Sequence, residues 1–341
     1  MTDRLSAPLW VVTPYYNPAG YRRRLRNFHA FRRALSAPLL VVELAREGRH
    51  ELGDDDADVV IRLTGEDRIW QKERLINVGV DALPRHVKYV AWADCDLLFE
   101  TPDWPAMACE RLERDGGLLQ LFSSAYYMPR GVEPETATLA SCAQAAPLMQ
   151  AVSSVAAART GMFEENDKVA QEARGRYELL TRMNAYGIAW AAVRSQFEAC
   201  GLFDGNIMGG GDAVKTFALL DRMALYWRRR PSSPALRAYA ERWVARAAAE
   251  GFIGRADNLE GRVFHLWHGE IVDRNYRGRH HILTDLDFDP ARDVALAENG
   301  TWRWVDPDGP IACAVSAYFF ARYEDGRPSA GESGTPKSPQ P

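Results

Sequence analysis

An apolar run that ends in two acids lies near position 90 and reads Lys88-Tyr89-Val90-Ala91-Trp92-Ala93-Asp94-Cys95-Asp96. Its first six residues predict a buried strand. Residues two apart on an extended chain point to the same side, so Asp94 and Asp96 can face one ligand. Their oxygens suit a hard divalent cation that also binds a diphosphate. Acids at a strand end often only cap a loop, but this apolar run continues to Phe99. Buried acids are costly without a cation, which favours a metal site.

Strand and helix signals alternate on the N-terminal side of this run. Apolar residues at helical spacing predict helices over 21–35 and 70–82. Continuous apolar stretches predict further strands at 9–13, which Pro14 stops, at 38–44 and at 59–63. This alternation predicts an α/β fold of Rossmann type, a mainly parallel sheet with helices on both faces. Ligands of such sheets bind beyond the carboxyl ends of the strands.

The second half of the chain has a different character. After an apolar stretch at 118–122, residues 131–183 are rich in Ala, Gln and Glu and are expected to form a helical insertion beside the sheet. Strand character resumes over 186–193, and helices are expected over 212–227 and from the Ser233-Pro234 cap to about 250. We expect one domain over 1–324, with halves at 8–130 and 184–324 around the insertion, and a disordered tail over 325–341.

Composition excludes several classes of protein. The 341 residues include 42 Lys and Arg against 46 Asp and Glu, a net charge of −4, which argues against a nucleic-acid binder. No apolar run approaches a transmembrane segment, and the N-terminus lacks the pattern of a signal peptide. The five cysteines are far apart, with no spacing typical of a metal site. We therefore expect reduced thiols and a cytoplasmic protein.

His265 and His268 lie three residues apart in Val263-Phe264-His265-Leu266-Trp267-His268-Gly269. On a straight strand they would point to opposite faces, so shared ligation needs a turn, which Gly269 allows. Imidazoles can complete a carboxylate site for Mn²⁺, although one core and one surface histidine is the simpler interpretation. Arginines follow closely at 274, 277 and 279, and they either bind phosphate or form a solvated basic loop.

A glycine run precedes the helix expected from position 212 and reads Gly209-Gly210-Gly211-Asp212. Successive glycines let a ligand approach the backbone closely. Asp212 either caps the helix or accepts a proton at the rim of a pocket. The spacing of a P-loop is absent, and no G-x-G-x-x-G follows the first strand, which weighs against a dinucleotide enzyme.

Taken together, five segments between residues 8 and 305 resemble metal-dependent nucleotide-sugar glycosyltransferases of the GT-A fold, near family 2 and the β-1,4-galactosyltransferases. The matching segments, in the order of the family, are 12–17, 70–77, 94–96, 209–212 and 265–268. The resemblance implies an inverting transfer of a hexose from a UDP-sugar to an acceptor hydroxyl. The acceptor would be a glycan, a lipid-linked intermediate, a protein or a small molecule.

The resemblance also implies a role for each matching residue. Asp96, His265 and His268 would bind Mn²⁺, or Mg²⁺ in its place, and Asp212 would be the general base. Trp70 would stack on the uracil, Lys72 would meet the donor, and Asp94 would bind the ribose or a metal-bound water. The other residues expected to contact the nucleotide sugar are Thr13, Pro14, Tyr15, Asn17, Gly210 and Gly211.

Two positions depart from the pattern of the family. Gly211 replaces a glutamate that helps to hold a sugar, and Met208 replaces a tryptophan that stacks on sugars. Met208 and Trp190 are expected at the acceptor and sugar platform, although Trp190 could instead belong to the core. These departures leave the identities of donor and acceptor open.

Two other functions remain possible from the sequence alone. A sugar-phosphate nucleotidyltransferase also uses a nucleotide domain with acidic metal ligands, but its glycine-rich basic loop after the first strand is absent. A nucleotide-sugar binding protein of the same fold that has lost activity is compatible with Gly211.

Overall fold

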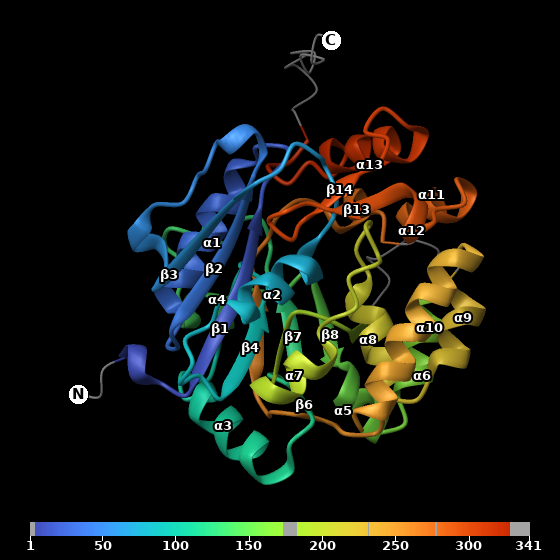
Figure 1. The fold of residues 1–341 in the computed structure, drawn as a ribbon. Helices are drawn as coiled ribbons and strands as arrows, with labels where there is room; N and C mark the ends of the chain where they lie inside the picture. The colour runs from blue at the N-terminus through green and yellow to red at the C-terminus, as the bar shows by residue number, and fades with distance from the viewer. Residues whose placement is uncertain (1–3, 173–182, 231, 277, 328–341) are drawn as a thin grey trace.

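A seven-stranded sheet forms the centre of the fold, and the apolar strand near the N-terminus lies inside it (Figure 1). The computed structural model describes residues 4–172, 183–230, 232–276 and 278–327. In spatial order the strands are β11 (Ala256–Asn258), β6 (Leu118–Gln120), β10 (Ala189–Val193), β4 (Tyr89–Ala93), β1 (Leu9–Tyr16), β2 (Leu39–Ala45) and β3 (Val59–Thr64). The four strands β4, β1, β2 and β3 are parallel, and β10 is antiparallel to both of its neighbours. The mainly parallel α/β sheet expected from the sequence is confirmed.

Two smaller sheets complete the strands of the described residues. The five-stranded sheet consists of β5 (Leu97–Phe99), β12 (Arg262–His265), β7 (Ser124–Tyr127), β8 (Met149–Ser153) and β9 (Met183–Ala185). A two-stranded ribbon pairs β13 (Val294–Leu296) with β14 (Trp302–Trp304).

The α-helices of the described residues are α1 (Arg22–Ala34), α2 (Lys72–Asp81), α3 (Trp104–Asp115), α4 (Leu139–Gln144), α5 (Ser154–Arg159), α6 (Phe163–Glu172), α7 (Arg194–Cys200), α8 (Gly211–Leu219), α9 (Met223–Arg229), α10 (Pro234–Ala249), α11 (Arg279–Asp285), α12 (Pro290–Asp293) and α13 (Pro310–Phe320). Short 3₁₀ turns are η1 (Arg4–Ser6), η2 (Arg46–Gly48), η3 (Asp54–Asp56) and η5 (Ile271–Arg274).

Strand alternation sends the side chains of the central sheet into two separate cores. Trp10 and Val12 of β1 pack into the core that α2 covers, whereas Leu9 and Val11 pack into the core that α1 covers. Because both faces of the strands are buried, the strands read as continuous apolar runs rather than alternating ones. The expected covering of both faces by helices is thus confirmed.

Strand β1 does not stop at Pro14, as the sequence predicted, but continues to Tyr16. The Val11 N–H donates to the Pro38 carbonyl on the β2 side, so the N–H groups of even-numbered residues face β4. Proline has no backbone N–H to donate. At position 14 this costs no hydrogen bond in the sheet, because an N–H there would face β4, which pairs only with Leu9–Val12. Tyr15 and Tyr16 therefore extend β1 at its carboxyl end.

Three other predictions need correction. The segment 131–183 contains α4, α5 and α6, but also β8, which pairs with β7, so it is not purely helical; its residues 173–182 lie outside the described part. The helix expected over 212–227 is divided into α8 and α9, with Asp221 at a φ of 55° between them. The division of the chain at 130 and 184 remains a prediction.

The prediction of a disordered tail is wrong for residues 325–327, which make defined contacts. The Asp325 carboxylate accepts hydrogen bonds from the backbone N–H groups of Arg22 and Arg23, and Arg327 pairs with Asp273. Residues 328–341 lie outside the described part of the chain. The segment after α13 therefore contacts the start of α1 through Asp325 and the turn η5 through Arg327.

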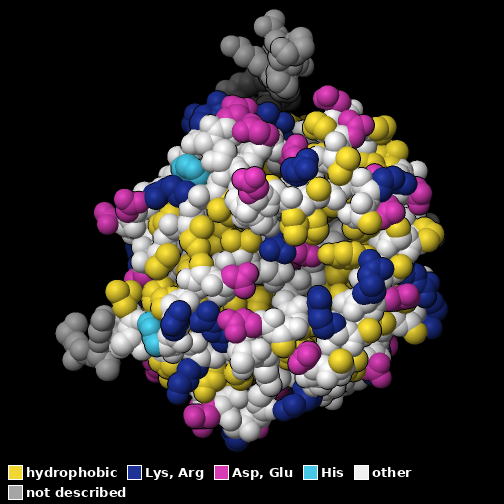
Figure 2. Space-filling model, viewed as in Figure 1, with side chains coloured by type: hydrophobic (Ala, Val, Ile, Leu, Met, Phe, Trp, Pro, Cys, Tyr) yellow, Lys and Arg dark blue, Asp and Glu magenta, His cyan; other side chains and the backbone are white. Residues whose placement is uncertain are grey.

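The surface carries mixed charges, and side chains of both signs are interspersed on the face shown in Figure 2. In the described part of the chain, no helix combines the length and the apolar character that crossing a bilayer requires. All five cysteines are free thiols, as expected.

Candidate functional site

A cavity of about 500 Å³ lies where the ends of β1, β4 and β12 meet the first residues of α2 and α8. This is the strand-end edge at which parallel sheets bind ligands. Each of these elements contributes residues to the lining: Pro14 and Tyr16, Asp94 and Asp96, His265 and His268, Lys72 and Glu73, and Gly210 and Asp212. The cavity therefore collects most of the chemically active residues that the sequence singled out.

Asp96 and the two histidines form a compact cluster, as the sequence predicted. The Asp96 carboxylate lies 3.2 Å from His268 Nε2 and 3.6 Å from His265 Nε2. Strand β12 ends at His265, and the chain then turns, so that the Leu266 N–H donates to the Asp96 carbonyl over 2.8 Å. That turn brings two histidines three residues apart to the same carboxylate.

The atoms of this cluster fit a divalent cation. One ligand atom from each of Asp96, His265 and His268 lies within 4.8 Å of the others. His265 Nδ1 lies 3.1 Å from the Leu266 carbonyl oxygen, which can only accept, so Nδ1 carries the proton and Nε2 presents its lone pair. Asp96 Oδ1 and His268 Nε2 are buried and have no hydrogen-bond partner among the described residues. Buried polar atoms of this kind, with one carboxylate and two imidazoles, match the ligands of Mn²⁺ and related ions.

Electrostatics holds Asp96 and His268 in the protonation states that a metal needs. Burial, together with the nearby Arg274, lowers the pKa of His268 to about 3, so its imidazole is neutral. Burial opposes ionisation of Asp96, but the surrounding positive charge, which includes Arg274 and Arg24, lowers the pKa of the carboxyl. Neutral imidazole and ionised carboxylate are the ligand forms.

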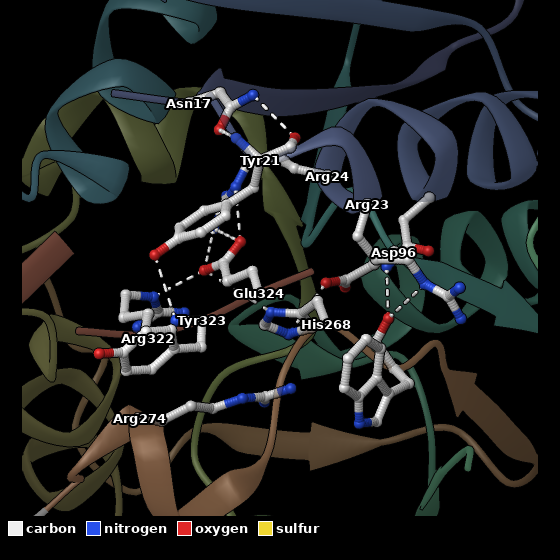
Figure 3. Close-up of polar contacts among 12 residues, drawn as sticks. Asn17, Tyr21, Arg23, Arg24, Asp96, His268, Arg274, Arg322, Tyr323 and Glu324 are labelled. Atoms are coloured by element: carbon white, nitrogen blue, oxygen red, sulfur yellow. Dashed lines mark hydrogen bonds and ion pairs between the residues drawn. The ribbon is translucent and has the colours of Figure 1, made fainter. Parts of the chain in front are cut away.

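Glu324 lies behind His268, on the side opposite Asp96 (Figure 3). Its Oε1 lies 3.8 Å from His268 Nδ1, and its carboxylate also pairs with Arg24 at 2.7 Å and with Arg322 at 2.6 Å. Burial would raise the pKa of Glu324, but the two arginines hold it well below its usual value. The C-terminal segment thus places a buried, ionised carboxylate behind one candidate metal ligand.

Lys72 joins two carboxylates at the floor of the cavity. Its Nζ lies 2.6 Å from Asp94 Oδ1 and 2.9 Å from Asp212 Oδ2. Burial disfavours the ammonium ion, but Asp212 and Asp94 outweigh it and raise the pKa of Lys72 well above its usual value. Burial likewise opposes ionisation of Asp212, yet Lys72 and Lys215 lower the pKa of its carboxyl. Asp212 is therefore an ionised, partly exposed carboxylate that faces the cavity.

Asp212 is not the N-cap of its helix. Gly210 occupies the cap position of α8 with a φ of 92°, which favours glycine, and Asp212 follows in the first turn. A negative charge in the first turn interacts favourably with the helix dipole.

Two buried arginines in the lining have no acidic partner among the described residues. Arg274 and Arg279 are 2% and 6% exposed, and each donates from Nη1 over 2.9 Å to a tyrosine hydroxyl, of Tyr276 and Tyr318 respectively. The Nε of each lacks a partner in the part of the chain that the structure describes. Guanidinium groups left in this state favour an anionic ligand such as a phosphate.

Aromatic rings line another part of the cavity. Trp70 and Phe319 of α13 lie nearly parallel, at 16°, with ring centroids 6.1 Å apart. Tyr16 meets Phe319 edge to face at 5.7 Å. The guanidinium groups of Arg279 and Arg322 lie 5.5 and 5.0 Å from the Trp70 ring centroid. This aromatic group offers flat surfaces for a planar ligand.

Only part of the predicted nucleoside loop reaches the cavity. Pro14 lines it, but Thr13 is buried and donates to the Ala93 carbonyl over 2.5 Å. Tyr15 is also buried and donates to Glu51 over 2.7 Å, while the Asn17 side chain bonds to Tyr21 and Glu51. These three residues shape the loop and are absent from the cavity lining.

The hypothesis that Trp190 or Met208 is a sugar platform is wrong, because both side chains are fully buried. Trp190 lies on β10, where alternation points it into the core, and its Nε1 donates to the Tyr186 carbonyl over 3.0 Å. Lys215 Nζ covers its ring, 3.3 Å from the centroid. A side chain packed in this way cannot stack on a sugar.

Gly211 has a physical reason to be glycine. A Cβ at this position would lie 2.7 Å from the Glu73 carboxyl and 2.7 Å from the Phe203 carbonyl oxygen. Four residues of the site were not predicted from the sequence: Glu73, and Phe319, Arg322 and Glu324 near the C-terminus. No motif marks them, although Glu73 is adjacent to Lys72.

Comparisons with known proteins give only distant likenesses. No protein-family model and no curated protein match the chain. Glucosyl-3-phosphoglycerate synthase from Mycobacterium tuberculosis, in complex with Mn²⁺, UDP and phosphoglyceric acid, is 11% identical with a TM-score of 0.33, over 75% of this chain and 70% of that one. S. aureus TarS 1-349 in complex with UDP-GlcNAc is 10% identical with a TM-score of 0.38, over 79% of this chain and 62% of that one, so the chain spans less than two thirds of it. With TM-scores below 0.5, these likenesses assign no activity to this chain.

Proposed function

We propose that the protein is a metal-dependent glycosyltransferase of the GT-A type that moves a hexose from a UDP-sugar to an acceptor hydroxyl with inversion. The observation that supports this function best is the convergence of three groups in one cavity. These are the Asp96–His265–His268 cluster, the unpaired guanidinium groups of Arg274 and Arg279, and the Lys72–Asp212 pair.

The anionic part of the ligand follows from charge. Arg274 and Arg279 are buried cations without acidic partners among the described residues, and such groups are costly unless a ligand supplies the counter-charge. A diphosphate between these arginines and the cation cluster would supply it. The aromatic rings of Tyr16, Trp70 and Phe319 would then contact the uracil.

Asp96, His265 and His268 are the residues that would hold Mn²⁺, or Mg²⁺ in its place. When bound there, the ion stabilises the negative charge that develops on the departing UDP. Glu324 would keep the His268 ring in the orientation for binding.

Asp212 is proposed as the general base. The acceptor oxygen would attack the anomeric carbon, the bond from that carbon to the diphosphate oxygen would break, and the hydroxyl proton would pass to Asp212. Lys72 keeps Asp212 ionised, which is the state that a base needs. A single displacement of this kind inverts the anomeric configuration. Asp94, the other partner of Lys72, would bind the ribose or a metal-bound water.

The test is a panel of UDP-sugars incubated with the protein and Mn²⁺, with UDP release as the readout. Release that a chelator abolishes supports the proposal. Pyrophosphate release from UTP and a sugar phosphate would instead identify a nucleotidyltransferase. Binding of UDP-sugars without turnover, with or without a range of acceptors, would identify an inactive binding protein.

A further inference from the structure

Glu73 is a buried carboxyl group of the cavity that the proposed mechanism does not use. It lies in the first turn of α2, directly after Lys72, and its side chain is among those that line the cavity. Only 3% of the residue is exposed, and its Oε1 has no hydrogen-bond partner within the described residues. By contrast, buried Glu324 is fully paired with arginines.

The position of this carboxyl group depends on the absence of a side chain at 211. A Cβ on Gly211 would lie 2.7 Å from both Cδ and Oε1 of Glu73. Glu73 thus occupies the volume that a side chain at the start of α8 would fill. Helix α2 places two consecutive functional groups here, Lys72 against Asp212 and Glu73 against Gly211.

The protonation state of Glu73 suits recognition of a hydroxyl group. Burial, with a further contribution from Asp212, raises the pKa of Glu73 to about 8, so the carboxyl is largely protonated at neutral pH. A protonated carboxyl both donates and accepts a hydrogen bond, as does a sugar hydroxyl. A buried polar group without a partner destabilises the folded protein unless a ligand pairs with it.

We propose that Glu73 hydrogen-bonds a hydroxyl of the donor hexose and so contributes to the selection of the sugar. The inference rests on the proposed function. Asp212 must face the acceptor oxygen at the anomeric carbon, and Glu73 lies against the residue next to Asp212. The aromatic rings and the cation cluster are assigned to the uracil and the diphosphate, so the hexose is the part of the donor that remains for this carboxyl.

The experiment compares the affinity for UDP with the affinity for a UDP-hexose, by calorimetry in the presence of Mn²⁺. UDP-glucose, UDP-galactose and UDP-N-acetylglucosamine serve as probes, and the one that binds wild type best is used for the variants. Glu73→Met keeps the size of the side chain and removes its hydrogen bonds, and Glu73→Ala answers the same question should the Met variant fail to fold. Asp81→Asn, an exposed acid of the same helix, is the control.

For Glu73→Met and Glu73→Ala, we expect the ratio of UDP-hexose affinity to UDP affinity to fall about tenfold, which corresponds to one hydrogen bond. The affinity for UDP alone should stay within about twofold of wild type, because the proposal assigns Glu73 to the hexose and not to the nucleotide. The melting temperature of Glu73→Met should be unchanged or higher, because an apolar side chain replaces an unpaired buried polar one.

Three outcomes would overturn the inference. An unchanged affinity ratio in both variants would remove Glu73 from sugar binding while leaving the proposed function intact. A lowered melting temperature with weakened binding of UDP itself would show a structural role. Failure of the wild-type protein to bind UDP with Mn²⁺ would contradict the proposed function itself, and the role of Glu73 with it.

Discussion

Lys72 Nζ and Asp212 Oδ2 lie 2.9 Å apart in a half-buried ion pair, although 140 positions separate the two residues in the sequence. The pair joins the first turn of α2 to the first turn of α8, and it holds the proposed base ionised beside the cavity.

Replacing Asp212 with Asn should abolish transfer while leaving ligand binding intact. The amide cannot accept the proton of the acceptor hydroxyl, so turnover should fall about 10²–10⁴-fold. UDP release gives the rate, and calorimetry gives the affinity for UDP with Mn²⁺. Asp221→Asn, an exposed acid after α8, is the control, because asparagine tolerates its positive φ. Unchanged turnover in Asp212→Asn would exclude this residue as the base.

Replacing His268 with Ala should weaken Mn²⁺ binding. The variant removes one of the three candidate ligands, and we expect affinity to fall by more than about tenfold in a calorimetric titration of the ion. His29→Ala is the control, because His29 is exposed and pairs with Asp56 outside the cavity. Equal affinity in His268→Ala and wild type would refute the assignment of this ligand.

Replacing Glu324 with Gln tests its support of His268. The amide keeps the size of the side chain but loses the charge that faces His268 Nδ1, so Mn²⁺ affinity should fall roughly 10–100-fold. Glu133→Gln offers a comparison, since Glu133 also pairs with two arginines but is largely exposed. If Mn²⁺ affinity stays at the wild-type level, Glu324 serves only to pair Arg24 and Arg322.

Lys215 should make stability depend on pH in the alkaline range. Burial lowers its pKa to about 7 in the folded protein, although Asp212 opposes this, whereas the unfolded chain titrates near 10.5. Between these values the unfolded state holds a proton that the folded state has lost, so the unfolding free energy rises with pH. The total rise is on the order of 5 kcal/mol.

The variant Lys215→Met lacks this group and should lose the rise. Its stability advantage over wild type should be largest below pH 7 and should shrink toward pH 10. Chemical denaturation of both proteins at several pH values measures the difference. A difference that does not change with pH would show that Lys215 keeps its ordinary pKa.

Local patterns were sufficient to predict much of the fold and part of the site. Continuous apolar runs marked β1, β2 and β4, because strands buried on both faces need apolar residues at every position. The edge strand β3 is only partly buried, and its shorter apolar run was still sufficient to mark it. Asp96, His265 and His268 could be predicted as a cluster because carboxylates and imidazoles at such spacings are typical of metal sites, and the structure brings the three together. Their convergence is a consequence of the turn after β12, which brings the Leu266 N–H to the Asp96 carbonyl.

The rest depends on tertiary contacts that no local pattern encodes. Glu324 lies near His268 and pairs with Arg24, although 300 positions separate Glu324 from Arg24 in the sequence. From the sequence alone, charged residues in this segment resemble a solvated tail. Trp190 and Met208 belong to the core because of how β10 and the glycine loop pack, which residue type alone does not reveal. The position of Glu73 beside Gly211 is a tertiary contact that neither residue type predicts.

In the proposed function, one cavity binds a divalent cation and a uridine diphosphate together. Calorimetric titration of the protein with UDP, with and without Mn²⁺, measures this coupling. We predict that Mn²⁺ tightens UDP binding on the order of tenfold or more. The same UDP affinity in Mn²⁺ and in excess chelator would contradict the claim.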